Sequence, residues 1–453
     1  MGRSSVRWLY WLGSAIARLL VSAAALIVGV LPASAESLRI YHIDVNQADA
    51  TLIVSPGGNT ILIDCGGEGQ GDWVKAVMDD AGVTDLDYFL LTHYHGDHAG
   101  GIDELVGEEE VQVGTAFDRG DKDFLDADRL DDDFYENYQA ALGEEAEALR
   151  RGESVDLDPD MAVTCVAHGT AVLGEEDPID HGSDENDMSV ALLVQYGPFR
   201  YFTGGDLEEH TESKIAARDL VLDVDVYRAS HHGSDTSSSA ELMSDMSPSL
   251  IVISNGDHGG HKHPKQSVLD DFAAMEPRPI VLQTNKYTKG GSGGNVADRF
   301  IADLDPTGSE GTILVTVDEG GASYEVSYAD TSFTLQTKPR EDISPPAPVV
   351  IASLVPDPVG SDRDLETVML RSRTSEVVSL HGWTLADESG GVWTLSGIGE
   401  LAPSDTVTVV RAGMTMSLNN TGDHVYLRDS DAEVVDDWSY EDSSEGVRIR
   451  TGK

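Results

Sequence analysis

Three histidines and one aspartate fall within six positions directly after an apolar run, in the stretch LLTHYHGDHAGG at residues 90–101. His93 and His95 are separated by one residue, so both rings can face one side of an extended or tightly turned backbone. Asp97 and His98 follow at once and can point toward a neighbouring position. Imidazole nitrogens combined with carboxylate oxygens suit zinc, manganese or iron and argue against calcium. The stretch therefore predicts a metal site at the end of a strand, with a solvated histidine-rich loop as the alternative.

Strand-like and helical segments alternate around this stretch. From Leu38 onward, short β-branched and aromatic runs are separated by Gly, Pro and Asn turns, and a hairpin turn is expected at 56–59. Helices are expected over DWVKAVMDDAG and near 208–220, 238–246 and 264–275. The pattern predicts an α+β domain, for which a layered sandwich fits better than a doubly wound sheet.

Two segments interrupt this rhythm. Residues 119–160 are rich in acids and have helical spacing from Phe134 to Leu149, which indicates an ordered insertion, with a solvated acidic face as the alternative. Residues 338–350 contain three prolines within four positions and predict an extended linker. The short strands beyond it, rich in Trp, Gly and Thr, predict an all-β sandwich over 351–446, followed by a tail at 447–453.

The first 35 residues differ from the rest of the chain. Arg3 and Arg7 precede an apolar run of about 13 residues, which is shorter than the roughly 20 that a membrane-spanning helix needs. The small residues 33–35 follow, as at a signal-peptide cleavage site. We expect residues 1–35 to be a cleaved signal peptide and the protein to be secreted, periplasmic or extracellular, with no other membrane insertion; an uncleaved anchor is the alternative.

The chain is strongly acidic, with 81 Asp and Glu against 30 Lys and Arg and a formal net charge of −51. Such a surface repels polyanions unless a basic groove or bound cations offset it. Hydration of an exported protein, in a saline habitat for instance, is the simpler reading of this charge. The two cysteines, Cys65 and Cys165, lie in apolar strand-like segments, which leaves open whether they pair or stay buried thiols.

The residues from His93 to His98 match in full the HxHxDH signature of the metallo-β-lactamase superfamily, which the chain therefore resembles. The resemblance implies an αββα sandwich with two divalent metal ions, zinc or manganese, the first on His93 and His95 and the second on Asp97 and His98. It makes Asp206, in RYFTGGDLE, the carboxylate that bridges the two ions, with a helix N-cap as the alternative role. From the late motif HHGS it takes one histidine for the second ion, and we favour His231 over His232; a surface pair is the alternative.

Longer segments resemble the ComEC/Rec2-like branch, the nucleases of DNA-uptake competence, over residues 38–328. The segment YHIDVNQADATLIVSPGGNTILIDCGG resembles the DVGQGDA opening of that branch and contains Asp49 and Asp64, of which Asp64 would orient a histidine ligand. The segment ENDMS supplies Asn186 and Ser189, and HKHP supplies His263 near the metals. The domain would then span 36–337.

The chain departs from the family pattern at several positions. Asn46 and Ala48 replace the glycines of DVGQGDA. Where many members have a further histidine ligand, the chain offers DHGSDENDMS, which leaves Asn186, a water or His181 for that role. His168 is expected to be structural. The pair Lys286 and Lys289 beside GGSGG could meet substrate phosphates, with solvated lysines as the alternative.

The resemblance implies hydrolysis by a water held between two cations about 3.5 to 4 Å apart. Asp97 would act as a ligand essential for catalysis, and His263 would donate a hydrogen bond to the developing oxyanion or protonate the leaving group. The expected substrate is nucleic acid, as a DNA phosphodiester. The alternatives are a lactone, thioester or phosphate monoester hydrolase of the same fold, and a noncatalytic protein that binds a surface.

The last part of the chain resembles the lamin-tail domain. Gly382 to Leu385 match its G-W-x-L pattern, Glu366 matches its first strand, and Asn420 to Asp429 match its N-x-G-D-x-V-x-L-x-D segment. Ser404 replaces the usual glycine of its turn. The resemblance implies an immunoglobulin-like sandwich without catalytic residues, which binds a cell-surface component or DNA or is a passive stabilising module.

Overall fold

The computed structural model of the chain describes residues 37–120, 132–143, 146–173, 184–257, 260–339, 348–360, 365–372, 377–387, 389–402, 405–430, 432–440, 443 and 448–450. The expected signal peptide and most of the expected linker lie outside these residues. Within them, no helix has the length and apolar character needed to cross a membrane.

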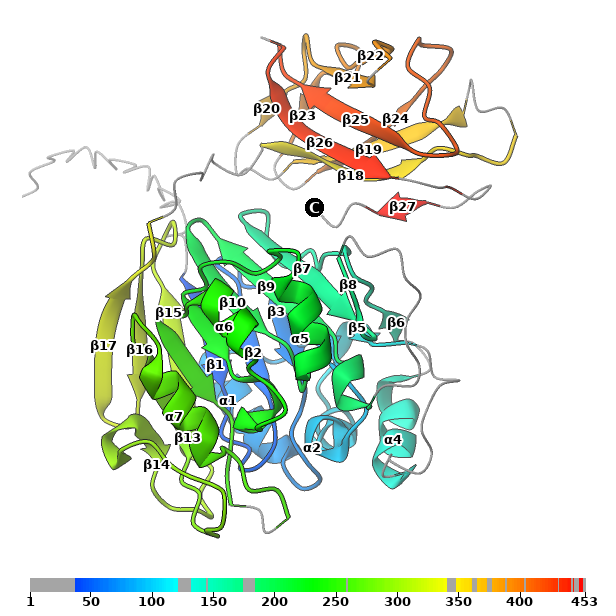
Figure 1. Cartoon of the computed structure of the whole chain (residues 1–453). Coiled ribbons are helices and arrows are strands. Elements are labelled where there is room, and N and C mark those ends of the chain that lie inside the picture. The colour runs from blue at the N-terminus through cyan, green and yellow to red at the C-terminus, as the bar shows by residue number, and fades with distance from the viewer. Residues whose placement is uncertain are drawn as a thin grey trace, which may run out of the picture. The chain divides into compact units, whose positions relative to one another are not determined.

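Two β-sheets form the centre of the first domain (Figure 1). The first sheet has the order β17-β16-β15-β1-β2-β3-β4-β5-β6 and the second has the order β14-β13-β12-β11-β10-β9-β7-β8. The strands of the first sheet are β1 (Leu38–His42), β2 (Thr51–Val54), β3 (Thr60–Ile63), β4 (Leu86–Leu90), β5 (Val113–Asp118), β6 (Glu147–Ala148), β15 (Ile313–Val317), β16 (Ser323–Tyr328) and β17 (Thr331–Gln336). Those of the second are β7 (Met161–His168), β8 (Ala171–Val172), β9 (Ala191–Tyr196), β10 (Phe199–Thr203), β11 (Val226–Arg228), β12 (Leu250–Ile253), β13 (Ile280–Asn285) and β14 (Ile301–Asp303).

Apolar residues on both faces of the central strands explain the layering. On β3, Ile61 and Ile63 join the core between the two sheets, whereas Leu62 faces the helices on the outside. On β12, Val252 points inward and Ile251 packs under the helices of the other side. Because side chains alternate along a strand, a continuous apolar run buries both of its faces.

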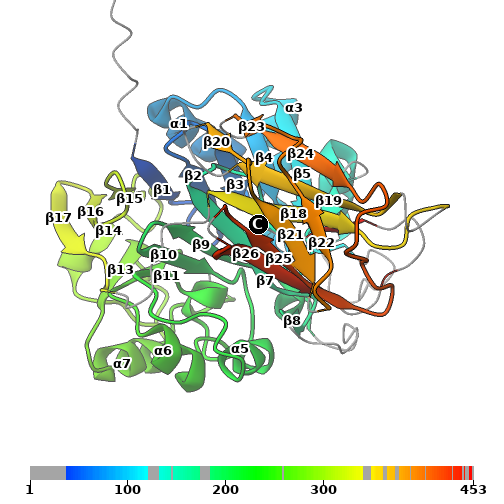
Figure 2. The ribbon, with the colours of Figure 1, turned by 90° about the horizontal axis from the view of Figure 1, so that it is seen from above.

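Helices cover the outer face of each sheet. Figure 2 shows α1 and α3 on the side of the strands opposite to α5, α6 and α7, and the buried clusters of each side agree with this arrangement. The helices are α1 (Gly71–Ala81), α2 (Gly96–Ala99), α3 (Ile102–Gly107), α4 (Asp132–Tyr138), α5 (Glu209–Ala216), α6 (Ala240–Met246) and α7 (Gln266–Ala274), with short turns of 3₁₀ or π type at Asn186–Met188, Ser230–Gly233, Asp298–Phe300 and Gln139–Gly143. The first domain is an αββα sandwich, as the sequence predicts.

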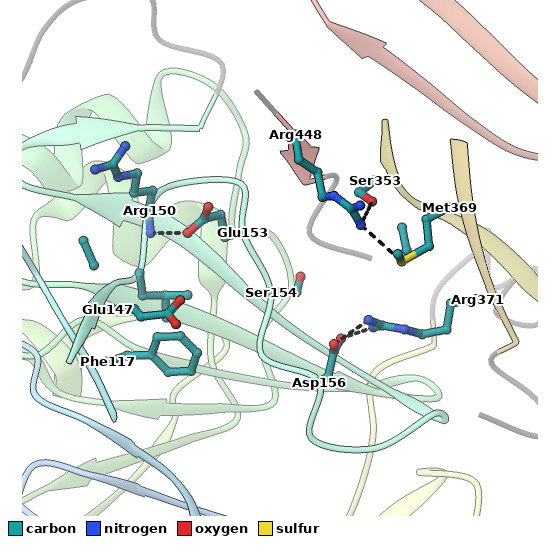
Figure 3. A pocket seen from close by; sticks show the side chains of 13 residues that line it. Phe117, Glu147, Arg150, Glu153, Ser154, Asp156, Ser353, Met369, Arg371 and Arg448 are labelled. Atoms are coloured by element: carbon teal, nitrogen blue, oxygen red, sulfur yellow. Dashed lines mark hydrogen bonds and ion pairs between the residues drawn. The ribbon is translucent and has the colours of Figure 1, made fainter. Parts of the chain in front are cut away.

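Helical structure in the acidic insertion is shorter than its spacing suggested. It ends at Gly143, and the strand β6 already covers Glu147 and Ala148, where a helix to Leu149 was expected. A turn after β6 is closed by the backbone N–H of Arg150, which donates to the Glu153 carboxylate at 2.9 Å (Figure 3). The two cysteines stay unpaired and buried, each in a different apolar cluster.

The last part of the chain is all-β within its described residues. One sheet has the order β24-β19-β18-β27 and another has the order β22-β21-β25-β26, beside the two-stranded pair β20-β23. Trp393 is fully buried in the separate core of this domain and donates from its ring N–H to the carbonyl of Met416 at 2.9 Å. Figure 3 shows Arg448 beside Ser353 of β18. The strands are β18 (Val349–Val355), β19 (Thr367–Ser372), β20 (Val378–Ser379), β21 (Thr384–Asp387), β22 (Val392–Thr394), β23 (Glu400–Leu401), β24 (Thr406–Val410), β25 (Asp423–Arg428), β26 (Val434–Tyr440) and β27 (Ile449–Arg450).

Candidate metal centre

The residues of the HxHxDH motif lie where strands of the two sheets end. His93 and His95 stand in the loop after β4, and α2 carries Asp97 and His98. Asp206 follows β10, and the two adjacent histidines of the late motif follow β11, which is parallel to β10. The strands β3, β4 and β5 are also parallel to one another. Because loops after the carboxyl ends of parallel strands share one edge, segments more than 100 positions apart converge there.

His93 and His95 form the first half of the site. The Nε2 atom of His93 lies 3.0 Å from the Nδ1 atom of His95, so one nitrogen of each ring faces the same point. Burial, together with the neighbouring His98 and His95, lowers the pKa of His93 well below its ordinary value. A neutral imidazole keeps a lone pair for a cation, which is the form that metal binding requires.

His98 is held between two carboxylates. Its Nδ1 atom lies 2.7 Å from Asp64, and its Nε2 atom lies 3.3 Å from Asp206. Burial opposes protonation, but the two carboxylates outweigh it and raise the pKa of His98 well above the ordinary value. Asp64 also accepts hydrogen bonds from the backbone N–H and the hydroxyl of Thr92, at 2.8 and 2.9 Å. Asp64 thus fixes the ring so that Nε2 points into the site, the role that the sequence predicts for it.

Asp206 turns its two oxygens toward different histidines. Oδ1 is nearest to Nε2 of His98, whereas Oδ2 lies 3.6 Å from Nε2 of His232 and 3.8 Å from Nε2 of His231. The hydroxyl of Ser189 accepts the backbone N–H of Asp206 at 3.1 Å and donates to the carbonyl of Asn186 at 2.7 Å. A carboxylate that presents one oxygen to each side can be shared by two cations.

The sequence favours His231 as a ligand of the second ion, and the geometry leads us to propose His232 for this role instead. His232 is buried, its Nδ1 atom lies 2.9 Å from the carbonyl of Ser254, and its Nε2 atom lies 3.3 Å from Asp97. His231 is more exposed and contacts the Thr236 hydroxyl through Nδ1 at 3.1 Å. Both residues have left-handed backbone angles, with φ of 52° and 53°, which turns the two rings in different directions.

Polar atoms without hydrogen-bond partners gather where the expected cations would bind. Nε2 of His98, Nε2 of His232 and Oδ1 of Asp206 are buried and make no hydrogen bond. Such atoms cost about 1–3 kcal/mol each when they stay unsatisfied. In three groups of residues the ligand atoms lie within 4.8 Å of one another: His93, His98 and Asp206; Asp97, His98 and His232; and Asp49, Asp64 and His98. The donor set of imidazoles and carboxylates therefore fits divalent zinc or manganese.

Arg228 contacts two carboxylates at this centre. Its guanidinium is fully buried, lies 2.5 Å from the carboxylate of Asp49 and donates to the carbonyl of Gly205 at 2.6 Å. It also lies 3.7 Å from Asp206, so it offsets part of the negative charge that the two carboxylates bring into the interior. Asp49 in turn donates its backbone N–H to the carbonyl of Asp97 at 3.0 Å, which ties the two loops together.

The centre opens into a cavity of about 420 Å³. His263 lies on its wall, and burial, together with His232 and His231, lowers the pKa of His263 to about 3. The full lining consists of Gln47, His95, Asp97, Phe134, Asn186, Asp206, His231, His232, His261 and His263.

Sequence reasoning missed three residues of this wall, one of which, His261, stands in the HKHP segment two positions before His263. Gln47 stands in the DVNQADA segment that resembles the family's opening motif, so a signal for it existed. Phe134 comes from the acidic insertion, which carries no such motif. Conversely, Lys286 and Lys289 are not among the described residues that line the cavity, and their ammonium groups lie 2.9 Å from Asp298 and 3.2 Å from Asp257.

Asn186, one of the three candidates that the sequence offered for a further ligand, lines the cavity. Its Nδ2 atom lies 3.3 Å from Nε2 of His231, and its Oδ1 atom is buried without a hydrogen-bond partner. His181 lies outside the described residues. His168 is buried and its Nε2 atom contacts the carbonyl of Arg119 at 2.6 Å, in keeping with the structural role expected for it.

Comparisons with known proteins agree with the fold and the motif. Residues 43–116 match the metallo-beta-lactamase superfamily, and residues 343–442 match the Lamin Tail Domain. The chain is 24% identical to ComE operon protein 3 of Bacillus subtilis over 262 residues, which cover 53% of this chain and 31% of that protein. It is 28% identical to Recombination protein 2 of Haemophilus influenzae over 239 residues, or 51% of this chain and 26% of that protein. The matched region is therefore less than a third of either relative.

Shorter and more distant matches exist as well. Atrochrysone carboxyl ACP thioesterase of Passalora fulva is 38% identical over 63 residues, which are 13% of this chain and 18% of that protein. Among solved structures, a β-lactamase from Chitinophaga pinensis is 16% identical with a TM-score of 0.29 and covers 43% of this chain and 76% of its own. The chain thus carries a metallo-β-lactamase superfamily domain, similar to part of ComE operon protein 3 and of Recombination protein 2, followed by a lamin tail domain.

Proposed function

We propose that this metal-dependent hydrolase is an exported phosphodiesterase that acts on DNA with two divalent cations. The observation that carries the proposal is Asp206, whose two oxygens face separate groups of ligands at the floor of one cavity. The similarity to ComE operon protein 3 and Recombination protein 2 supports nucleic acid as the substrate. Export rests on the leader expected at residues 1–35.

Different residues of the site would have different roles in the reaction. Two divalent cations, when bound, supply Lewis acidity and make water a nucleophile near neutral pH. His93, His95, Asp97, His98, Asp206 and His232 would hold them. Because its pKa is about 3, His263 is neutral at pH 7 and can donate a ring N–H to an oxygen that gains negative charge. Arg228 and Asp64 keep Asp206 and His98 in position.

A second candidate is hydrolysis of a thioester or lactone. No Lys or Arg is among the described residues that line the cavity. Arg119 is also buried away from it, in an ion pair with Glu185 at 2.8 Å. A polyanion would therefore meet few fixed cations at the site, whereas an uncharged ester would not need them.

The test is to measure bound metal and then turnover of single-stranded DNA, duplex DNA, bis(p-nitrophenyl) phosphate, a lactone and a thioester by the same preparation. We expect about two divalent ions per chain and hydrolysis of the diesters. The Asp97→Ala variant should lose more than about 100-fold in kcat, since even residues that only support a ligand are worth 10–100-fold.

The matched control is Asp79→Ala, which removes an exposed carboxylate from the surface of α1. It should keep wild-type turnover. Cleavage of the thioester or lactone, with both DNA and the diester intact in the metal-loaded protein, would establish the second candidate instead. Full activity of Asp97→Ala would reject the site.

A further inference from the structure

The helix α4 of the acidic insertion is anchored to the ligand loop by tyrosines. Tyr94, which stands between two histidines of the motif, packs against Tyr135 and Tyr138 with ring centroids 5.0 and 5.9 Å apart. Tyr138 is fully buried, and its hydroxyl donates to the carboxylate of Asp118 at 2.9 Å. In Figure 1, α4 lies beside α2, the helix that carries Asp97. The insertion therefore presents a fixed helix at the rim of the metal centre.

Phe134 is the residue that this helix brings to the cavity. It lines the wall together with His95, Asp97 and His263. Its ring rests on Gly96, because a Cβ added there would lie 2.4 Å from a ring carbon of Phe134. The ring thus covers the backbone between two metal-ligand candidates, and only a glycine at position 96 leaves room for it.

The buried core clusters formed by the described residues do not include this aromatic ring. Tyr138 belongs to the buried cluster on that side of the sandwich, and Tyr135 and Leu142 pack against it, whereas Phe134 is not part of the cluster. Phe134 is half-buried and lines the cavity. A large apolar side chain that is held in place yet left out of the core is available for a ligand.

We propose that Phe134 contacts the substrate by stacking on an aromatic ring next to the scissile bond. The described residues of the cavity wall include no Lys or Arg, so recognition beyond the metal centre falls to apolar and neutral polar groups. Aromatic side chains bind bases through their π-faces in a sequence-tolerant way. Under the proposed function, on which the identity of the ring rests, the partner is a nucleobase.

Two ligand pairs test the stacking contact. The first is dithymidine monophosphate and its abasic analogue with tetrahydrofuran in place of both nucleosides, compared in turnover. The second is thymidine 5′-monophosphate and deoxyribose 5-phosphate, compared in binding by calorimetry. The members of each pair carry the same phosphate group and differ at C1′, where the base is replaced by hydrogen in the first pair and by hydroxyl in the second.

We expect the metal-loaded wild-type protein to favour the base-containing member of each pair. Phe134→Ala should raise KM and Kd for these members by roughly 10-fold, in line with the worth of one stacked base, and leave the abasic members and kcat nearly unchanged. Phe134→Trp should restore the preference. Because Phe134 lies outside the core cluster, all variants should keep wild-type metal content and melting temperature.

Equal values for both members of a pair in the wild-type protein, or no effect of Phe134→Ala on the base-containing members, would overturn the contact. If Phe134→Ala weakens binding of both members of a pair equally and also loses metal, Phe134 has a purely structural role. This result would overturn the stacking contact too. If dithymidine monophosphate binds with base preference but no diester is cleaved, the proposed function fails while the stacking contact stands. If the diesters are turned over without base preference, the stacking contact fails while the proposed function stands.

Discussion

His98 occupies an unusual electrostatic position, since it is buried between Asp64 and Asp206, which raise its pKa. In the metal-free protein the ring therefore keeps a proton on Nε2 through neutral pH. A cation that binds Nε2 must displace this proton. The pKa of His93 and that of His231 are lowered by burial, so these rings release no proton near neutrality.

Metal affinity should accordingly rise with pH, by about tenfold per pH unit where one proton is displaced. In the metal-free protein, the stability of the fold depends on pH with the opposite sign. The ion pairs of His98 stabilise the fold fully below about pH 6.5, the ordinary pKa of histidine. This contribution is lost as the pH rises through the raised pKa of His98. Calorimetric metal titration between pH 6 and 8 measures the effect. Asp64→Asn should flatten the pH slope and weaken binding by about 10–100-fold. A wild-type affinity independent of pH would contradict this account of His98.

The two histidines of the late motif should differ in their effect on metal content. His232 points Nε2 at Asp97 and Asp206, whereas His231 lies closer to Asn186. We expect His232→Ala to bind about one ion fewer per chain and His231→Ala to keep both. Elemental analysis after dialysis against buffered zinc measures this, and the adjacent variant is the control. The reverse result would restore the assignment made from the sequence.

At the scale of elements, the fit between α4 and the ligand loop depends on one missing side chain. Gly96→Ala places a methyl group against the ring of Phe134 and should lower the free energy of unfolding by about 1–3 kcal/mol, the usual cost of overpacking. In the Phe134→Ala background the same change should cost much less. Urea denaturation of both single variants and the double variant measures the coupling. Additive costs would mean that the two residues do not touch.

The same element shows how far sequence reasoning reaches. Periodicity and short motifs predict the sandwich, the tail domain and the ligand loops. The ends of α1, α6 and α7 fall within two residues of their expected positions, whereas α5 ends at Ala216, four residues before its expected end. The insertion has acidic composition and helical spacing but no motif, and nothing in it predicts that Phe134 meets Gly96. Adjacent residues such as His231 and His232 also cannot be ranked from sequence, because their ring directions depend on backbone angles.

Two lysines show a third limit of prediction from the sequence. Lys286 and Lys289 lie near the expected site in sequence order and carry the right charge for phosphate. In the fold each has an aspartate within ion-pair distance, Asp298 and Asp257, which lie 12 and 32 positions away along the chain. Pairing between distant loops depends on tertiary structure and leaves no local pattern.

At the scale of the whole molecule, a net charge of −51 should dominate the encounter with a polyanion. Salt screens repulsion as well as attraction. For DNA we therefore expect kcat/KM to rise by about 2- to 10-fold as NaCl is raised from about 10 to 150 mM at fixed metal concentration. Bis(p-nitrophenyl) phosphate, a small monoanion, is the control and should respond much less. A steep fall with salt would reveal phosphate contacts by a basic groove.

The convergence of the ligands also dictates an order of events when the chain folds. His93 to His98 follow a strand of the first sheet, whereas Asp206 and His232 follow strands of the second. Neither sheet alone provides the full set of candidate ligands. More than 100 residues separate the ligands that follow the first sheet from those that follow the second. The paired centre cannot exist until both sheets have formed and closed on each other, since loops of this length must be closed first. If the proposed centre binds two ions, their joint occupancy would report a completed sandwich, and an intermediate with one finished sheet would lack part of the ligand set.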